Sequence, residues 1–224
     1  MKSKKTGTKP LNRQSLDKES VIRAAIKLAD EGGLEGLSMR KLGRALGVEG
    51  MALYHHFVNK EALIDSMVDR IHGEISVPTI TNDWRLSMRE RAISALKALS
   101  RHTWAVPIME SRKAPGPLSM ELIDATIKIW LKAGFSIEMV AHLVSVLDAY
   151  TLGFAQQLRS PTGSIEEEAQ MGKEIMANFP FDQYPHVGQL VSEVFVKAGY
   201  RSLKEFEYGL DLILDAIARL EPGK

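Results

Sequence analysis

The chain has 224 residues, enough for one large domain or two modest ones, and its 45% hydrophobic and 25% charged residues are ordinary for a soluble globular protein. It contains no cysteine, which excludes disulfides, thiolate nucleophiles and cysteine-ligated zinc and fits a reducing, cytoplasmic setting. No uninterrupted apolar run approaches the roughly 18 residues of a membrane span, so we expect no membrane association.

The formal net charge is only +1, but the charges are unevenly distributed. Residues 1–60 hold 12 lysines and arginines against 6 acidic residues, whereas the rest of the chain holds 17 against 22. A positive end on a slightly acidic body is expected of a protein that faces the phosphates of a nucleic acid with that end. The alternative is a chance asymmetry in a small count.

The chain begins with a basic segment, residues 1–14, that has no acidic residue. Its cations are Lys2, Lys4, Lys5, Lys9 and Arg13. We expect a flexible arm, which either reaches along DNA or only keeps the chain in solution. A helix capped by Ser15 or Asp17 follows, and Gly32 and Gly33 are expected to end it.

Three further helices are predicted before residue 75. Ser38 caps a short helix, which Gly47 ends in a turn. The inward-facing residues of this helix are expected to be Met39, Leu42, Ala45 and Leu46. Residues 50–56 form the next helix, of about two turns, and Asn59 caps a longer one that ends before Pro78. Two short helices joined at Gly47 predict a helix-turn-helix.

Beyond Pro78 the sequence pattern is helical almost throughout. The predicted segments are 83–101, 104–112, 118–133, 136–158, 165–178, a loose stretch near 187–197, and 203–220. Nothing alternates with period two for long enough to form a sheet. The predicted fold is all-α, with the arm at 1–14, a three-helix helix-turn-helix DNA-binding domain at 15–75 and a larger helical domain at 76–224.

The start of each short helix carries residues that suit DNA. The hydroxyl of Ser38 lies at a helix N-terminus, where free N–H groups and the helix dipole attract a phosphate oxygen. Arg40 projects from the same end and can reach a phosphate or a guanine edge. The second helix of a helix-turn-helix enters the major groove with its first residues at the base edges. Here these are Gly50, Met51 and Ala52, which suit thymine methyl groups and close backbone approach.

Tyr54, His56 and Lys60 come next, at positions that flank the groove and would contact phosphates. Leu53 and Phe57 are expected to point inward and to fix the helix to its neighbours. The alternative is a half-buried aromatic patch beside an ordinary solvated lysine. The combination of all these residues in one block favours DNA contact.

Residues 17–71 resemble the DNA-binding domain of the tetracycline-repressor (TetR) family. The matching residues are Ala24 and Ala25, Gly32 and Gly33, Leu37 to Leu42, Leu46 to Val48, Ala52 to Phe57, and Asn59 to Leu63. Members are homodimeric, all-α transcriptional regulators, usually repressors, which release palindromic operators when a small molecule binds the second domain. The resemblance implies phosphate contacts for Ser38, Tyr54, His56 and Lys60, and base or groove contacts for Arg40, Gly50, Met51 and Ala52.

The second domain resembles the C-terminal domain of the tetracycline repressor itself, which implies effector binding and dimerisation at 76–224. The similar segments are Asp83-Trp84, the region of His102 and Trp104, Gly134 to Ser136, Thr151 to Gly153, and Phe206 to Ile213. Ser76, Arg91 and Ala95 stand where the tetracycline-binding member has a histidine, an amide and a phenylalanine. Tetracycline is therefore not the expected ligand, and the effector stays unidentified.

Helices 136–158 and 203–220 are the predicted dimer interface. The second carries an apolar stripe of Phe206, Leu210, Ile213, Leu214 and Ile217. The first is apolar nearly all round, which is typical of a helix buried on two sides. Pairing with the same helices of a second copy would give a four-helix bundle, and burial within one monomer is the alternative.

The effector pocket is expected between helices of the second domain, with mostly apolar walls and a few polar groups. The candidates, which combine aromatic bulk with a hydrogen-bonding tip, are His102, Trp104, Trp130, His142 and Tyr150. Each of them could instead be a packed core residue. We expect no metal site and no cofactor, because the six histidines form no pair at metal-ligand spacing.

Two other classes of function were weighed. An enzyme is not expected, because the sequence has no phosphate-cradling glycine loop, no cysteine nucleophile and no Gly-x-Ser-x-Gly elbow. A helical protein-interaction module without DNA binding would leave the basic first 60 residues unexplained. The predicted partners are an operator duplex, a second copy of the chain and a small-molecule effector.

Overall fold

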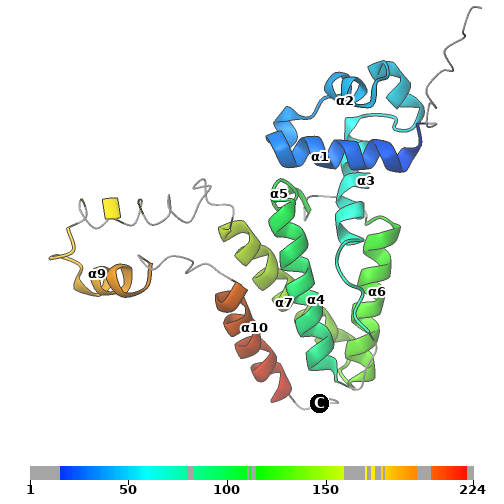
Figure 1. Ribbon diagram of the computed structural model, residues 1–224. Helices are drawn as coiled ribbons and strands as arrows, with labels where there is room; N and C mark the ends of the chain where they lie inside the picture. The colour runs from blue at the N-terminus through cyan, green and yellow to red at the C-terminus, as the bar shows by residue number, and fades with distance from the viewer. Residues whose placement is uncertain are drawn as a thin grey trace, which may run out of the picture. The chain divides into compact units, whose positions relative to one another are not determined.

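The computed structural model describes residues 16–79, 83–109, 111, 115–158, 170, 173–174, 178, 180–195 and 203–220. Helices account for the regular structure of these segments, and none of them contains a strand, which confirms the all-α prediction. The predicted arm lies outside the described residues, as does most of the predicted helix 165–178. The chain divides into two compact units, Met1–Val68 and Asp69–Lys224 (Figure 1).

The first unit begins with α1 (Lys18–Gly36). Asp17 caps it: its carboxylate accepts a hydrogen bond from the Ser20 N–H at 2.6 Å, which lowers the pKa of Asp17. The predicted stop at Gly32 and Gly33 is a kink, since Gly33 has φ +65° and a last helical turn follows it. Only glycine adopts this left-handed conformation without strain.

Two short helices and a long one complete this unit: α2 (Met39–Leu46), the 3₁₀ helix η1 (Gly50–His55) and α3 (Lys60–His72). The buried side chains of this unit come from α1 and from these three helices with the residues next to them. They include Val21, Ile22, Leu42, Leu53, Phe57, Leu63 and Met67. The prediction for Ala45 is wrong, because Ala45 is exposed and Gly43 is buried in its place. The α3 helix runs across the boundary between the units, which falls after Val68 rather than at residue 75.

The second unit is built from α4 (Trp84–Arg101), α5 (Val106–Met109), α6 (Pro117–Lys132), α7 (Ile137–Gln157), α9 (Pro185–Leu190), the π-helical turn η2 (Val191–Phe195) and α10 (Leu203–Ala218). The α4 helix packs on α6, α7 and α10, and α7 also contacts α5, α6 and α10 (Figure 1). Their shared core includes Met88, Leu96, Trp130, Leu147, Phe206 and Leu214. Gly134, at φ +93°, lets the chain turn from α6 into α7.

The α10 helix corrects one prediction about the dimer face. Phe206, Leu210, Leu214 and Ile217 are buried against the rest of the second unit, so most of the predicted stripe packs within one chain. The apolar side chains that α10 leaves exposed are Leu203, Tyr208 and Leu212. The apolar stripe correctly predicts that this face of α10 is buried. It does not show whether the same chain or a second copy buries it.

The α7 helix is apolar on more than one side, as predicted. Val140, Leu143 and Leu147 face the core, whereas Ile137 and Val146 are 57% and 49% exposed. Of the described helices, α7 alone is long and apolar enough to cross a membrane by length and composition, a test that core helices of soluble proteins also pass.

Candidate nucleic-acid interface and effector cavity

The start of α2 presents a cap and several cations. The Ser38 Oγ accepts a hydrogen bond from the Lys41 N–H at 3.2 Å, so the oxygen caps the helix while its own O–H remains a donor. Arg40, Lys41 and Arg44 are all exposed. Lys41 and Arg44 are not among the contact residues predicted from the sequence. Their positions on the polar face of a short amphipathic helix could have indicated that they are exposed cations.

The turn between α2 and η1 is closed by close contacts at two glycines. Gly47 has φ +68°, and the Val48 N–H donates to the Gly43 carbonyl at 2.9 Å. A Cβ on Gly43 would lie 2.8 Å from the Val48 oxygen, and a Cβ on Gly50 would lie 3.2 Å from the Met39 oxygen. Gly43 therefore leaves no room for a side chain, and Gly50 packs tightly against α2, a reason that the sequence pattern did not reveal.

The η1 helix turns two large side chains outward. Met51 is 76% exposed and Tyr54 45% exposed, while Leu53 is fully buried and Phe57 nearly so. Because residues i and i+3 of a 3₁₀ helix lie on the same face, Met51 and Tyr54 form one exposed surface. Ala52 is half-buried. Leu53 and Phe57 point inward, as predicted.

Lys60 is half-buried rather than fully solvated. Its Nζ donates to the Leu34 carbonyl at 3.3 Å, at the end of the kinked α1. An ammonium has three donors, so this bond leaves capacity for another acceptor. His56 is also half-buried. The structure thus gives Lys60 a structural bond beside its predicted phosphate contact.

The five predicted effector residues do not come together. Trp130 is fully buried, with its ring centroid 5.0 Å from that of Trp84, and His102 is buried with its Nε2 3.1 Å from the Glu74 carboxylate. Tyr150 donates to the Phe206 carbonyl at 2.9 Å, Trp104 is buried and His142 is exposed. Four of the five are engaged in packing or hydrogen bonds within the domain.

A cavity of about 160 Å³ lies elsewhere in the second unit. None of the five predicted residues lines it. Its apolar walls are Ile75, Ala95, Leu99, Met109, Leu122 and Leu152, and its polar groups are His72, Arg91, Asp148 and Thr151. Arg91 is 7% exposed, and its Nη1 lies 2.9 Å from the Asp148 carboxylate. The signal available in the sequence was a cation on the inward face of α4, between Met88 and Ala95.

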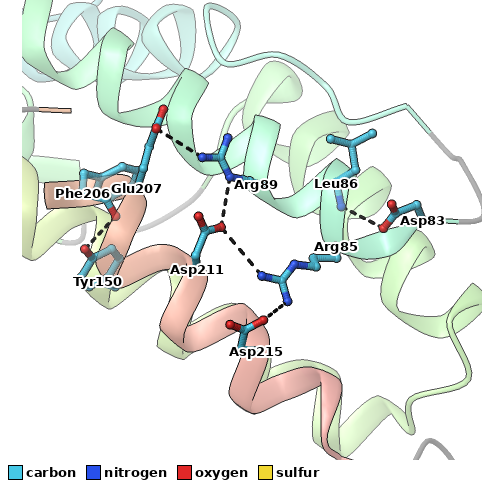
Figure 2. A network of polar contacts seen from close by, with 9 residues as sticks. All are labelled: Asp83, Arg85, Leu86, Arg89, Tyr150, Phe206, Glu207, Asp211 and Asp215. Carbon is cyan, nitrogen blue, oxygen red and sulfur yellow. Dashed lines mark hydrogen bonds and ion pairs between the residues drawn. The ribbon is translucent and has the colours of Figure 1, made fainter. Parts of the chain in front are cut away.

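A second polar network joins α4 to α10 (Figure 2). Arg89 pairs with Asp211 at 3.1 Å and with Glu207 at 3.3 Å, and Arg85 pairs with Asp211 and Asp215. The hydrogen bond that Arg89 donates to Asp211 raises the pKa of Arg89. These side chains are partly exposed, so the pairs contribute modestly to stability but fix how α10 lies along α4. Within the described residues no group of histidine and acidic side chains could hold a metal ion.

A compact helix-turn-helix with an exposed cationic and apolar face, on a chain whose other domain encloses a cavity, is typical of ligand-responsive DNA-binding regulators. Comparison with known families agrees. The family model of bacterial regulatory proteins of the tetR family matches residues 21–67, and the model of the tetracyclin repressor-like C-terminal domain matches residues 77–220. The chain belongs to the TetR family and is a DNA-binding transcriptional regulator.

Individual relatives cover nearly the whole chain. The tetracycline repressor protein class A from transposon 1721 of Escherichia coli is 32% identical over 209 residues, 91% of each chain. The HTH-type transcriptional repressor DrrR1 of Streptomyces coeruleorubidus is 28% identical over 95% of this chain and 82% of its own. The structure of Streptomyces coelicolor ActR in complex with actinorhodin aligns with a TM-score of 0.78 at 22% identity, covering 92% and 96% of the two chains.

Proposed function

We propose that the protein is a cytoplasmic repressor that binds a palindromic operator as a homodimer and leaves it when a small molecule occupies the helical domain. The observation that supports this most directly is the exposed face of η1, where Met51 and Tyr54 point outward beside the cations of α2. Two such faces, related by a twofold axis, would enter successive major grooves.

The predicted contacts divide into two groups. Ser38, Tyr54, His56 and Lys60 hold phosphates and position the domain, and the exposed Lys41 and Arg44 extend this group. Arg40, Gly50, Met51 and Ala52 lie at the base edges. Met51 suits a thymine methyl group and Arg40 a guanine edge.

The dimer would form through α7 and α10. Ile137 and Val146 on α7 and Tyr208 and Leu212 on α10 are exposed apolar side chains of a single chain. A second copy would cover them, which explains why α7 is apolar outside the core-facing side. The effector would enter the cavity beside Arg91. Among similar proteins, one is named a tetracycline repressor and another has a structure in complex with actinorhodin, which supports a small-molecule effector.

Operator binding is tested by titrating an operator duplex, selected from genomic fragments, at several salt concentrations. If about 8 phosphates are neutralised per dimer, the logarithm of the association constant should fall with the logarithm of salt concentration at a slope near −7. A scrambled duplex of equal length is the control. Binding that ignores salt, or no binding, would argue instead for a protein-interaction module.

A further inference from the structure

Arg91 lies on the wall of the cavity in the second domain and is 7% exposed. Not all of the hydrogen-bond donors of its guanidinium have acceptors. Among the described residues, its Nη1 pairs with Asp148, and its Nε is buried without a hydrogen-bond partner. A guanidinium has five N–H donors, and a buried donor without an acceptor costs about 1–3 kcal/mol. A bound ligand that accepts a hydrogen bond from Nε would offset this cost.

The edge of the guanidinium that Asp148 leaves open is the one suited to a carboxylate. Nε–H and one N–H of Nη2 point in the same direction, so that they bind the two oxygens of a planar oxyanion side by side. Asp148 bonds Nη1, which lies on the other edge, and its side chain is 41% exposed. Asp148 does not occupy that edge, but Nε is covered by neighbouring atoms, so a second carboxylate reaches it only after the Arg91 side chain or its neighbours shift.

Two other polar groups of the cavity, Thr151 and Asp148, do not compete as donors. The Thr151 hydroxyl donates to the Leu147 carbonyl at 2.8 Å, so only its oxygen, an acceptor, faces other groups. Asp148 is an acceptor as well. Arg91 is thus the fixed positive charge of the cavity wall, next to the half-buried His72.

The apolar wall of the cavity offers a place for a ring beside Arg91. The cavity volume of about 160 Å³ is enough for a single benzene-sized ring. Leu99, Leu122 and Ile75 supply apolar surface for such a ring. The cavity therefore combines an apolar space for one ring with an oxyanion-binding edge.

We propose that the effector is a compact organic acid, with one ring against the apolar wall and a carboxylate on the Nε and Nη2 edge of Arg91. The proposal rests on the effector-release function proposed above and names the chemical class of the effector.

The test compares two probes of the same shape, benzoate and its neutral amide, benzamide, by calorimetry on the full-length dimer and by release of a labelled operator duplex. Benzoate should bind at least about tenfold more tightly, because a charge-assisted hydrogen bond contributes about 1.5–3 kcal/mol. Equal affinity of the two probes, or no benzoate binding at millimolar concentration, would overturn the proposal.

Variants separate the roles of the two charges. Arg91→Met should reduce benzoate affinity at least about tenfold and leave benzamide unaffected, whereas Arg85→Met, the same substitution on the same helix away from the cavity, should change neither. Asp148→Asn should tighten benzoate binding because it removes a competing carboxylate. If Asp148→Asn instead abolishes benzoate binding, the ligand does not bind Arg91 independently of Asp148 and the proposal is wrong.

Two further results keep the tests distinct. Arg91→Lys, which keeps the charge but lacks the two-donor edge, should also weaken benzoate binding and serves if Arg91→Met does not fold. If benzamide releases the operator and benzoate does not, the proposal fails while the effector-release function stands. If the wild-type protein binds no duplex at all, the function proposed above fails independently of either probe.

Discussion

The Asp69 carboxylate, in α3, accepts hydrogen bonds from both the backbone N–H and the hydroxyl of Ser119, in the first turn of α6, each at 2.8 Å. It also accepts a weaker bond from the Leu118 N–H at 3.4 Å. Gly116, the residue before α6, has no side chain to cap the helix, and a Cβ there would collide with this carboxylate. A residue of one helix thus caps another, far away in the sequence.

We expect Asp69→Ala to lower the free energy of unfolding by about 1–2 kcal/mol, the usual cost of losing a helix N-cap. Ser119→Ala should cost less, because the backbone N–H of residue 119 still binds Asp69. Thermal and urea unfolding measure both. Equal losses for the two variants would show that the hydroxyl, rather than the cap, carries the stabilisation.

The same contact predicts that two substitutions are not additive. Gly116→Ala should destabilise the wild-type protein by about 1–3 kcal/mol through overpacking, and by clearly less in the Asp69→Ala background, where the carboxylate is gone. The double-mutant cycle gives the coupling energy. A cycle that closes to zero would mean that the Asp69 carboxylate is not what makes the substitution costly.

Gly43→Ala should disrupt the helix-turn-helix. Its Cβ would meet the Val48 oxygen at 2.8 Å and the Gly50 nitrogen at 2.9 Å, both of them backbone atoms that cannot move aside easily. We expect a loss of about 1–3 kcal/mol and a much weaker operator complex. Gly36→Ala is the matched control, because nothing lies within 4 Å of a Cβ there. Normal operator affinity of Gly43→Ala would contradict the proposed importance of this contact.

The parts of this domain that sequence predicted correctly are local ones. The caps Ser38 and Asn59 are present because each side chain bonds a backbone N–H three residues ahead, an interaction that needs no other part of the chain. Residues 50–56 were predicted as an ordinary helix, but the region is 3₁₀ from Gly50 to His55. The close packing of Gly43 and Gly50 involves residues from two helices and leaves no periodic signal.

In the second domain, the sequence does not show whether an apolar side chain is covered by its own chain or by a second copy. The apolar stripe of α10 was assigned to the dimer, yet Phe206 and Leu214 are buried by the same chain. Trp130, one of the aromatic residues expected at the effector site, is packed in the hydrophobic core. The criterion of aromatic bulk with a polar tip leaves Arg91 out, although the resemblance aligns Arg91 and Ala95 with an amide and a phenylalanine of the tetracycline-binding member, and both line the cavity.

Tyr150→Phe should lower the free energy of unfolding by about 1 kcal/mol, since it removes the hydrogen bond to the Phe206 carbonyl but keeps the stacked rings, whose centroids are 5.2 Å apart. Burial raises the pKa of Tyr150, so the phenol stays a donor at neutral pH. Gly209→Ala would place a Cβ against the Tyr150 hydroxyl. Its cost should therefore shrink in the Tyr150→Phe background, and an undiminished cost would refute the contact.

Glu74 predicts a pH-dependent contribution to stability. Burial alone would raise its pKa, but hydrogen bonds from Arg101 at 2.7 Å and from His102 outweigh this and hold the pKa below its ordinary value. A depressed carboxylate pKa stabilises the fold above the unfolded-state pKa of roughly 4.3, and the contribution disappears as pH falls through the lower folded value.

Glu74→Gln should accordingly cost about 1 kcal/mol near pH 7, since the side chain is partly exposed, and the difference from wild type should narrow below about pH 4. Thermal midpoints measured between acidic and neutral pH give this profile. Arg101→Gln removes one of the two partners and should produce a smaller difference with the same direction. A gap that stays constant with pH would show that the charge of Glu74 is not involved.

The two groups of DNA contacts should respond differently to substitution. Lys60→Ala and Tyr54→Phe would remove proposed phosphate contacts, so they should weaken binding to all duplexes alike, and Lys60→Ala should flatten the salt dependence by roughly one unit per phosphate lost. Arg40→Ala and Met51→Ala should instead change the preference among operator variants by about 1–3 kcal/mol per lost base contact.

Lys60 needs a control for its structural bond to the Leu34 carbonyl. Lys60→Gln keeps a donor for that carbonyl but removes the positive charge, so it should preserve the thermal midpoint while still flattening the salt dependence. If Lys60→Gln binds DNA with the wild-type salt slope, the lysine only fastens α3 to the end of α1. If Arg40→Ala and Met51→Ala weaken every duplex equally, the base-reading end of η1 has been placed wrongly, because a side chain at a base edge must distinguish sequences.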